Sequence, residues 1–254
     1  MKRIAVFIYG VISYAIFFAT FCYAYGWVGN ILVPRSIDSA PETSLGAALL
    51  VNLALLTVFA VQHSVMARPA FKKVLTRYIP KPAERSTYVL FSSLAMIAMF
   101  YFWRPMGITI WQVEDTVGQG ILYGLFTFGF LLVLVSTFLI NHFDLFGLRQ
   151  VWLYLRKKEY TRLRFTMPGP YKMVRHPLYV GWLFAFWATP HMTLAHLVFA
   201  LATTAYILVA IQLEERDLIA EHGDNYAAYR RSVPMLVPSF SRRGKAQGRS
   251  EAAA

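Results

Sequence analysis

Residues 169–181 read GPYKMVRHPLYVG and stand between a polar loop and a run of apolar residues. Pro177 suits the first position of a helix, because a backbone N–H there has no helical partner. Arg175 and His176 then precede a helix N-terminus, where free N–H groups and a partial positive charge favour a carboxylate or phosphate. The stretch therefore predicts a polar site at the point where the chain enters a membrane.

The composition is that of an integral membrane protein. Of the 254 residues, 57% are hydrophobic and only 15% are charged, and the mean hydropathy is +0.46, which is rare in a soluble domain of this length. A helix of about 20 apolar residues crosses a hydrocarbon core of about 30 Å. Four uncharged runs have this length, and two further runs form a hairpin around Pro190: 4–25, 45–66, 86–103 and 118–140, then 178–189 and 194–213. We expect an all-α, polytopic fold with five to six transmembrane helices.

Positive charge is distributed unevenly among the predicted loops. With the N-terminus inside, 23 of the 25 Lys and Arg residues fall on the inner side, and only Arg35 and Arg104 lie outside. The positive-inside rule therefore predicts cytoplasmic N- and C-termini. A basic inner face meets anionic lipid, so the lipid bilayer explains the net charge of +12 and no nucleic-acid partner is predicted.

The first apolar run is read as a membrane helix and not as a signal peptide. It is too long for the hydrophobic core of a signal peptide, and no small-residue cleavage pattern follows it. Cys22 is the only cysteine, and we expect it to be buried in this helix. One cysteine cannot supply a disulfide, an iron–sulfur cluster or a thiolate zinc site within the chain. Four histidines expected on the inner side also lack the close spacing of metal ligands, so no metal site is predicted: His63, His142, His176 and His222.

Local patterns predict how the spans sit in the bilayer. Ser44 is expected to cap the second run, and the basic segment 67–85 predicts a short amphipathic helix along the membrane. Residues 100–103 read FYFW and predict an aromatic belt at the outer interface. Small residues let helices approach closely, so the glycines of the fourth run are expected at packing positions: Gly118, Gly120, Gly124 and Gly129.

Two histidines close to the inner surface are candidate site residues. His63 ends the second run and His142 follows the fourth, and an ionisable group in or near the membrane is costly unless it is used. His142 and Asp144 either orient each other in a site, or Asp144 caps the next segment while His142 faces the interface. His63 is likewise either a site residue or an interfacial imidazole.

A second polar group follows the last apolar run. Glu214 and Glu215 are expected on the same side of the membrane as Arg175, so the two motifs enclose one pocket. Arg175 suits a carboxylate as a fork of donors, and Tyr171 and Tyr179 offer flat faces to an aromatic base or a cation. The alternative interpretation is a surface helix in which the glutamates form salt bridges with neighbouring arginines.

These motifs resemble the superfamily of isoprenylcysteine carboxyl methyltransferases and phospholipid methyltransferases. The motifs that carry the resemblance are Gly169-Pro170-Tyr171, Arg175-His176-Pro177-x-Tyr179-x-Gly181, Glu214-Glu215, Tyr226-x-x-Tyr229 and Val233-Pro234. The front half resembles the membrane-bound methanethiol S-methyltransferases and their NnrU-type relatives, in His63-Ser64-x-Met66-Ala67-Arg68-Pro69, Glu84-Arg85-Ser86-Thr87-Tyr88 and the stretch 141–150.

The resemblance implies an enzyme of a bacterial inner membrane that binds S-adenosylmethionine at its inner face and methylates a small apolar thiol. It implies one methyltransferase domain over 1–238, with the cofactor part at 165–238. The basic, small polar composition of 239–254 predicts a disordered tail. The cofactor site is expected to comprise Gly169, Pro170, Tyr171, Arg175, His176, Pro177, Tyr179, Gly181, Glu214, Glu215, Tyr226 and Arg230. The catalytic candidates are His142, His63, Arg175 and Asp144.

The difficult step of such a reaction is removal of the thiol proton. An alkyl thiol has a pKa of about 8.5 or above, and the thiolate is the reactive form. Three histidines are candidate bases without a ranking among them: His63, His142 and His176. Three other functions stay open from the sequence: methylation of a prenylated or lipid acceptor, a nicotinamide-dependent reductase related to sterol reductases, and a non-enzymatic membrane protein of the NnrU type.

Overall fold

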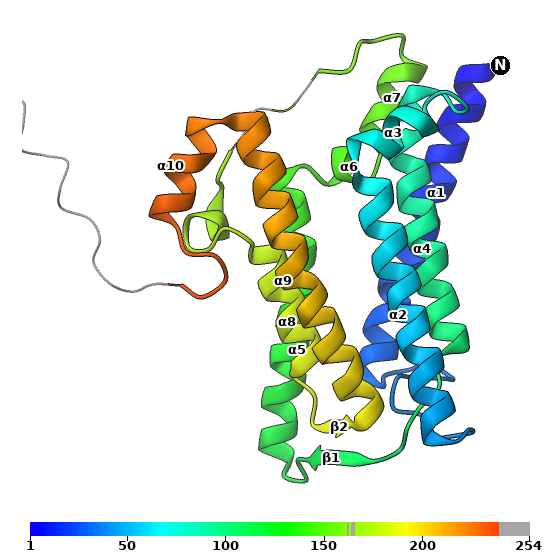
Figure 1. Ribbon diagram of the computed structural model, residues 1–254, viewed down its shortest axis with the longest axis vertical. Helices are drawn as coiled ribbons and strands as arrows, with labels where there is room; N and C mark the ends of the chain where they lie inside the picture. Colours follow the sequence, from blue (N-terminus) through cyan, green and yellow to red (C-terminus); the bar gives the residue numbers. More distant parts are fainter. Residues whose placement is uncertain (162, 164–165, 239–254) are drawn as a thin grey trace, which may run out of the picture.

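The computed structural model describes residues 1–161, 163 and 166–238. Its helices run lengthwise, with a small sheet across one end (Figure 1). The long helices are α1 (Lys2–Gly29), α2 (Leu45–Ala67), α4 (Glu84–Phe102), α5 (Thr116–Ile140) and α9 (Leu194–His222). The shorter elements are α3 (Pro69–Leu75), η1 (Lys81–Ala83), α6 (His142–Leu145), α7 (Leu148–Leu155), η2 (Gly169–Lys172), α8 (Pro177–Trp187) and α10 (Asp224–Ser232), with strands β1 (Thr109–Gln112) and β2 (His191–Thr193).

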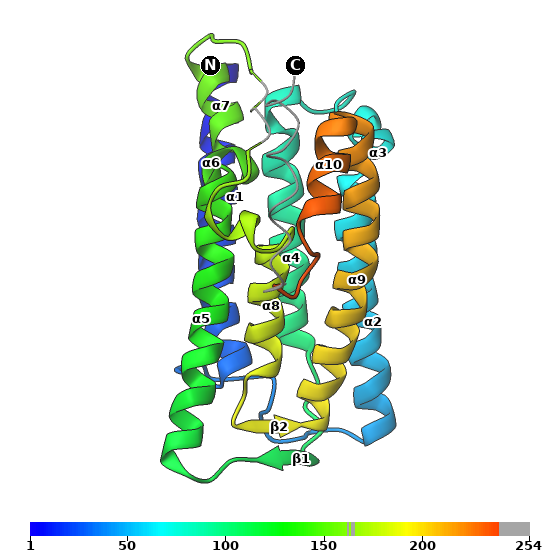
Figure 2. The same ribbon diagram turned by 90° about the vertical axis from the view of Figure 1, so that its left-hand side faces the viewer.

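The predicted class is confirmed, because the fold is that of an all-α, polytopic membrane protein. In the described part of the chain, 5 helices are long and apolar enough to cross a membrane. The sixth apolar helix, α8, has 11 residues, which at 1.5 Å per residue gives a length of about 16 Å. It is therefore too short to cross a bilayer unaided. Figure 2 shows α10 folded down beside α9, at the end of the bundle that carries the N-terminus.

Glycines bring α5 and α8 into backbone contact. A Cβ on Gly181 would lie 2.7 Å from the carbonyl oxygen of Gly129, so neither position accepts a side chain. The packing role predicted for Gly129 is confirmed, whereas it is wrong for Gly120 and Gly124, where an added Cβ would have no heavy atom within 4 Å. The sequence predicts Gly181 at the cofactor site. In the structure its lack of a side chain lets α8 pack closely on α5.

Aromatic side chains fill the centre of the bundle. The rings of Trp27 and Trp103 lie 5.6 Å and 5.9 Å from the ring of Phe199, which joins α1, α9 and the end of α4. The predicted aromatic belt at 100–103 is therefore only half correct. Tyr101 and Phe102 are exposed, whereas Phe100 and Trp103 are buried. Positions three apart share one face of a helix, so these two side chains face inward together.

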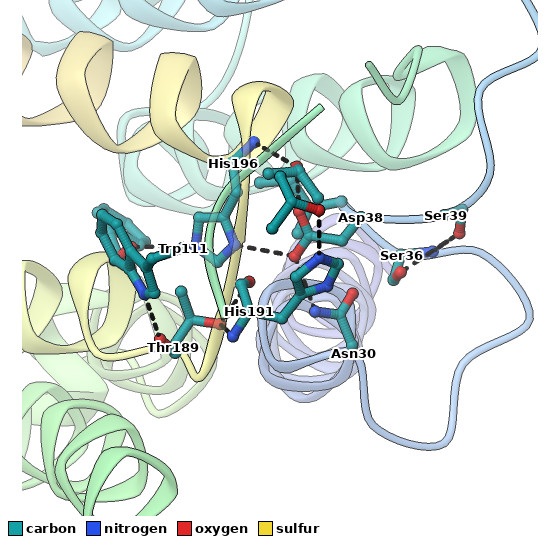
Figure 3. Close-up of polar contacts among 12 residues, drawn as sticks. Asn30, Ser36, Asp38, Ser39, Trp111, Thr189, His191 and His196 are labelled. Atoms are coloured by element: carbon teal, nitrogen blue, oxygen red, sulfur yellow. Dashed lines mark hydrogen bonds and ion pairs between the residues drawn. The ribbon is translucent and has the colours of Figure 1, made fainter. Parts of the chain in front are cut away.

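The end of the bundle that the sequence predicts to be outer is closed by β1 and β2, which pair antiparallel. A polar cluster beside this sheet fixes the loop between α1 and α2 (Figure 3). The carboxylate of Asp38 accepts hydrogen bonds from Asn30 at 2.8 Å and from the hydroxyl of Thr193, and it lies 3.0 Å from Nδ1 of His196. Nε2 of His196 lies 3.0 Å from the carbonyl oxygen of Phe186. His196 therefore joins the loop after α1 to the end of α8.

Three local predictions are corrected by the structure. Ser44 precedes α2, but its side chain makes no capping hydrogen bond. Cys22 is exposed on the surface of α1, not buried. The amphipathic helix expected over 67–85 is shorter than that segment and is divided between α3 and η1. The predicted tail, 239–254, lies outside the described residues.

Candidate active site

The segment before α8 is paired with the chain that follows α10. The backbone N–H of Arg175 donates to Pro234 O at 2.8 Å, and that of His176 donates to Met235 O at 3.2 Å. The Val-Pro motif singled out in the sequence therefore supports the Arg-His-Pro motif directly, although more than fifty residues separate them.

Glycine and proline shape the two ends of this segment. Gly169 has a φ of +52°, a left-handed conformation in which glycine is favoured. Pro170 lies in η2, and Pro177 is the first residue of α8, as predicted. The segment 169–176 therefore reaches α8 as a 3-10 turn followed by a bend at 175. This shape directs the side chains of 175 and 176 towards α9.

Glu215 is the centre of the site. Its side chain is only 3% exposed and lies on α9, where Oε1 accepts a hydrogen bond from Nε of Arg175 at 2.7 Å and lies 3.1 Å from Nε2 of His176. Its other oxygen pairs with Nε of Arg230 at 3.0 Å. A carboxylate only accepts, so Nε2 of His176 carries its hydrogen. The expected meeting of Arg175 and Glu215 at one end of the bundle is confirmed.

Glu214 differs from its neighbour because its side chain is 47% exposed. The phenol of Tyr179 donates to Oε2 of Glu214 at 3.0 Å, and Nδ1 of His176 lies 3.8 Å from the same oxygen. The two glutamates therefore differ in role. Glu215 forms ion pairs within the protein, whereas the carboxylate of Glu214 remains accessible beside them.

Arg175 is used inside the protein. Besides the contact with Glu215, its Nη1 donates to the carbonyl oxygens of Arg230 at 3.0 Å and Val233 at 2.6 Å, and its side chain is 10% exposed. We predicted from sequence that Arg175 would present a fork of donors to a ligand. In the structure, Nε and Nη1 instead tie α10 and the following segment to α9.

A cavity of about 280 Å³ lies between α9 and α10. Its walls carry both signs of charge, from Gln212, Glu215, Arg216, Ile219 and Arg230. Arg230 has a side chain that is 46% exposed, so it presents a cation to the cavity while it is oriented by Glu215. The cavity is thus suited to a small ligand with an anionic group.

The two tyrosines of α10 support this wall. Both are buried, and the phenol of Tyr229 donates to Tyr171 O at 2.6 Å. Burial raises the pKa of Tyr229 to about 12 and the pKa of Tyr226 further still. Both phenols are therefore neutral at physiological pH. The hydrogen bond from Tyr229 helps to hold the segment 169–176 against α10.

His63 lies in a second polar group, where α2, α4 and α9 meet. Its Nε2 is 2.7 Å from the phenol of Tyr88 and its Nδ1 is 3.2 Å from the hydroxyl of Ser92. The next residue, Ser64, is hydrogen-bonded to the phenol of Tyr206 at 3.1 Å. Tyr206 was not identified in the sequence; its only signal was a phenol inside an apolar run.

His142 and Asp144 do not orient each other. His142 is buried, with Nε2 2.8 Å from the phenol of Tyr14 and Nδ1 2.8 Å from the hydroxyl of Thr137. Asp144 instead pairs with Arg149 at 2.8 Å. Burial lowers the pKa of His142. The expectation of a His142–Asp144 pair is therefore wrong. The alternative cap of the following segment by Asp144 is wrong too, because Gly147 stands at the N-cap of α7 and no side chain caps that helix.

Titratable side chains are not clustered in the manner of a metal centre. Over the ranges 1–161, 163 and 166–238, no three or more His, Cys, Asp or Glu residues are grouped so that they could hold a metal ion.

Comparison with known proteins identifies the family. The model of the NnrU protein family matches residues 51–238, from α2 to the segment that pairs with Arg175 and His176. The chain belongs to the NnrU family. This NnrU-family match includes both the His63 group and the Glu215 cluster, so the two polar groups lie within the matched region.

Individual relatives cover nearly the whole chain. A methanethiol S-methyltransferase of Crocosphaera subtropica is 60% identical over 243 residues, which is 96% of this chain and 95% of the relative. A methanethiol S-methyltransferase of Mycobacterium tuberculosis is 53% identical over 94% of this chain and 98% of its own length. Nurim of Rattus norvegicus is 30% identical over 70% of each chain. No solved structure matches significantly. The predicted similarity to methanethiol S-methyltransferases and NnrU-type proteins is confirmed.

Proposed function

We propose that this NnrU-family protein transfers a methyl group from S-adenosylmethionine to methanethiol, forming dimethyl sulfide, at the cytoplasmic face of a bacterial inner membrane. The observation that carries the proposal is the 60% identity to a methanethiol S-methyltransferase across 96% of the chain. The charged cavity beside Glu215 supports it, because a methyl transfer needs a place for a charged donor next to apolar surface.

The residues present fit such a donor. S-adenosylmethionine carries a carboxylate, an ammonium group and a sulfonium, and the cavity offers the guanidinium groups of Arg216 and Arg230 for the first. Glu214, with a half-exposed carboxylate, suits either cation. Arg175 and His176 hold Glu215, and through it they orient Arg230. The cofactor set expected from sequence thus includes residues that contact the donor and residues that position them.

The bound donor supplies an electrophilic methyl group on a positively charged sulfur. The protein has to supply an acceptor freed of its proton, and we assign this task to Tyr88 and His63. The phenol of Tyr88 lies 2.7 Å from Nε2 of His63, and we assign the phenol as the donor, which places the imidazole hydrogen on Nδ1, facing Ser92. The thiol proton passes to the oxygen of Tyr88 as the phenol proton moves to Nε2 of His63. The thiolate forms without a charge being left on the phenol.

His63 is favoured over the other two histidines by its surroundings. Tyr206 lies beside His63 on α9, the helix that carries Glu214 and Glu215 towards its end. His142 contacts Tyr14 and Thr137 instead, on α1 and α5. His176 already uses Nε2–H to hold Glu215. His63 is thus the histidine whose partners adjoin the proposed donor site.

Binding and product formation test the proposal separately. Calorimetry on the purified protein in detergent should detect binding of S-adenosylmethionine and of its demethylated product. Headspace gas chromatography after addition of methanethiol should detect dimethyl sulfide. Arg230→Ala should weaken donor binding, and Arg231→Ala, an exposed neighbour of equal charge on the same helix, serves as its control. A folded protein that binds neither nucleoside would overturn the proposal.

A further inference from the structure

A second cavity lies in the membrane-embedded part of the bundle, between the middle of α2 and the middle of α9. Its volume is about 160 Å³. The residues that matter here are Leu53, Thr57, Phe59, Ala60, Ala202 and Tyr206. Leu53 is 44% exposed on the surface of α2, so the cavity opens on the side that faces lipid.

The side chains that line this cavity present mainly carbon atoms to it. The hydroxyl of Thr57 donates to Leu53 O at 2.7 Å, within its own helix. The phenol of Tyr206 is bonded to Ser64 at 3.1 Å. With their hydroxyls engaged elsewhere, these side chains present carbon to the interior. A water molecule needs two to four polar partners, so an apolar guest is favoured over water.

The inner end of the cavity adjoins His63. The ring of Phe59 stacks on the imidazole of His63 with centroids 5.3 Å apart, and the ring of Tyr206 lies 6.5 Å from the same imidazole, nearly perpendicular. Phe59 and Tyr206 also line the cavity. The two aromatic rings are therefore a shared wall between the apolar space and the proton acceptor assigned above.

We propose that the cavity between α2 and α9 is the entry site of the methyl acceptor, where small, uncharged, apolar thiols bind from the lipid side before they pass the rings of Phe59 and Tyr206 to reach Tyr88. The inference rests on the methyl transfer proposed above, and it adds the place and the size limit of the acceptor. An apolar cavity of about 150 Å³ holds a molecule of the size of benzene. The cavity thus accommodates methanethiol, ethanethiol or benzenethiol, but not a prenyl chain.

Filling the cavity tests this site. Ala202 lines it, and Ala205 lies on the same helix with its side chain exposed. Ala202→Leu should raise the KM for methanethiol about tenfold, since a few methylene groups in an apolar pocket change recognition by that much or more. The KM for benzenethiol should rise further. Ala205→Leu should change neither value, and both variants should bind S-adenosylhomocysteine like the parent protein in calorimetry.

A measurement without turnover gives an independent test. In a Cys22→Ser background, which removes the chain's only cysteine, Ala202→Cys and Ala205→Cys are each alkylated with N-ethylmaleimide. Dimethyl sulfide, which does not react with the reagent, should slow alkylation at position 202 and leave position 205 unaffected.

The outcomes separate this inference from the function on which it rests. Unchanged KM values in Ala202→Leu, together with no protection at position 202, would overturn the acceptor site while donor binding and dimethyl sulfide formation stand. Turnover of a prenylated thiol in preference to methanethiol would also overturn the size limit. Loss of donor binding in the parent protein would instead remove the proposed methyl transfer itself.

Discussion

Two buried carboxylates lie near opposite ends of α9, and they differ in what surrounds them. Both contact a histidine: Glu215 lies 3.1 Å from His176, and Asp38 lies 3.0 Å from His196. The pair beside β2, called the outer pair after the predicted orientation, is sealed, since the side chains of Asp38 and His196 are 2% and 0% exposed. The inner carboxylate also pairs with Arg230, whose side chain is 46% exposed and lines a cavity.

The difference separates a stabilising contact from a binding site. A sealed pair can act only within the protein, and it holds the loop after α1 against β2 and α9 (Figure 3). A buried anion with a partly exposed cation beside it positions that cation for a ligand. We therefore expect changes at the inner cluster to affect binding, and changes at the outer cluster to affect stability.

Glu215→Ala should have the largest effect. Arg175, His176 and Arg230 would lose their common acceptor, and removal of one partner from a buried ion pair costs about 3–5 kcal/mol. Arg230 would also lose the carboxylate that orients it towards the cavity, and we expect binding of S-adenosylmethionine to weaken about 100-fold, which is about 2.8 kcal/mol at about 1.4 kcal/mol for each factor of ten. Calorimetry measures the affinity, and circular dichroism checks that the helices persist. Wild-type affinity in a folded variant would contradict the role of Glu215.

Asp38→Ala should destabilise the protein without affecting the donor. Loss of the partner of His196 should lower the free energy of unfolding by roughly 3 kcal/mol. Denaturant unfolding in detergent measures this change. Asp115→Ala, which removes an exposed outer cap bonded to the N–H of Gly118, should cost only about 1 kcal/mol. If Asp38→Ala weakened donor binding as strongly as Glu215→Ala, the division between the two ends would be wrong.

The contact between Asp38 and His196 should also make the free energy of unfolding depend on pH. Burial opposes ionisation of Asp38, but the hydrogen bond and charge of His196, with hydrogen bonds from Thr193 and Asn30, outweigh it, so the pKa of Asp38 is lowered. A lowered pKa contributes stability that is present above the unfolded value of about 3.9 and is lost as pH falls through the folded value. The stability difference between wild type and Asp38→Ala should thus be constant above pH of about 5 and shrink below about 4. Thermal unfolding across this range measures it, and a constant difference down to the lowest pH would contradict the assignment.

Glu214→Gln should have the smallest effect. Its carboxylate is half exposed, and an exposed ion pair contributes at most about 1 kcal/mol, so donor affinity should fall no more than about fivefold. Calorimetry at low and high salt measures it, and the loss should diminish at high salt. An effect as large as that of Glu215→Ala would mean that both glutamates act in the same way.

The spans and the inner site could be predicted because their signals are local. An uncharged run of sufficient length is enough to identify a membrane helix. The charged ends of α8 and α9 must then meet on one side, which is how Arg175 and Glu215 were brought together. The partners of Arg175 could not be predicted. An arginine suits a ligand carboxylate and a backbone carbonyl such as that of Val233 equally well, and the sequence does not distinguish them.

Long-range contacts account for what was missed. Asp38 and His196 are 158 residues apart, and each stands alone among residues that give no motif. The strands β1 and β2 have 4 and 3 residues, too few for an alternating pattern to be recognised. His142 and Asp144 are close in sequence, but neighbours on a short turn point to different partners.

The exposed position of Cys22 on the surface of α1 has a chemical consequence. A catalyst that handles an activated alkyl donor risks modifying its own nucleophiles, and sulfur is the most vulnerable of these. Here the chain's single sulfhydryl lies on the periphery of the bundle, apart from the residues assigned to the reaction. The interior is thereby kept free of a competing thiol, and self-inactivation by alkylation has no sulfhydryl target there.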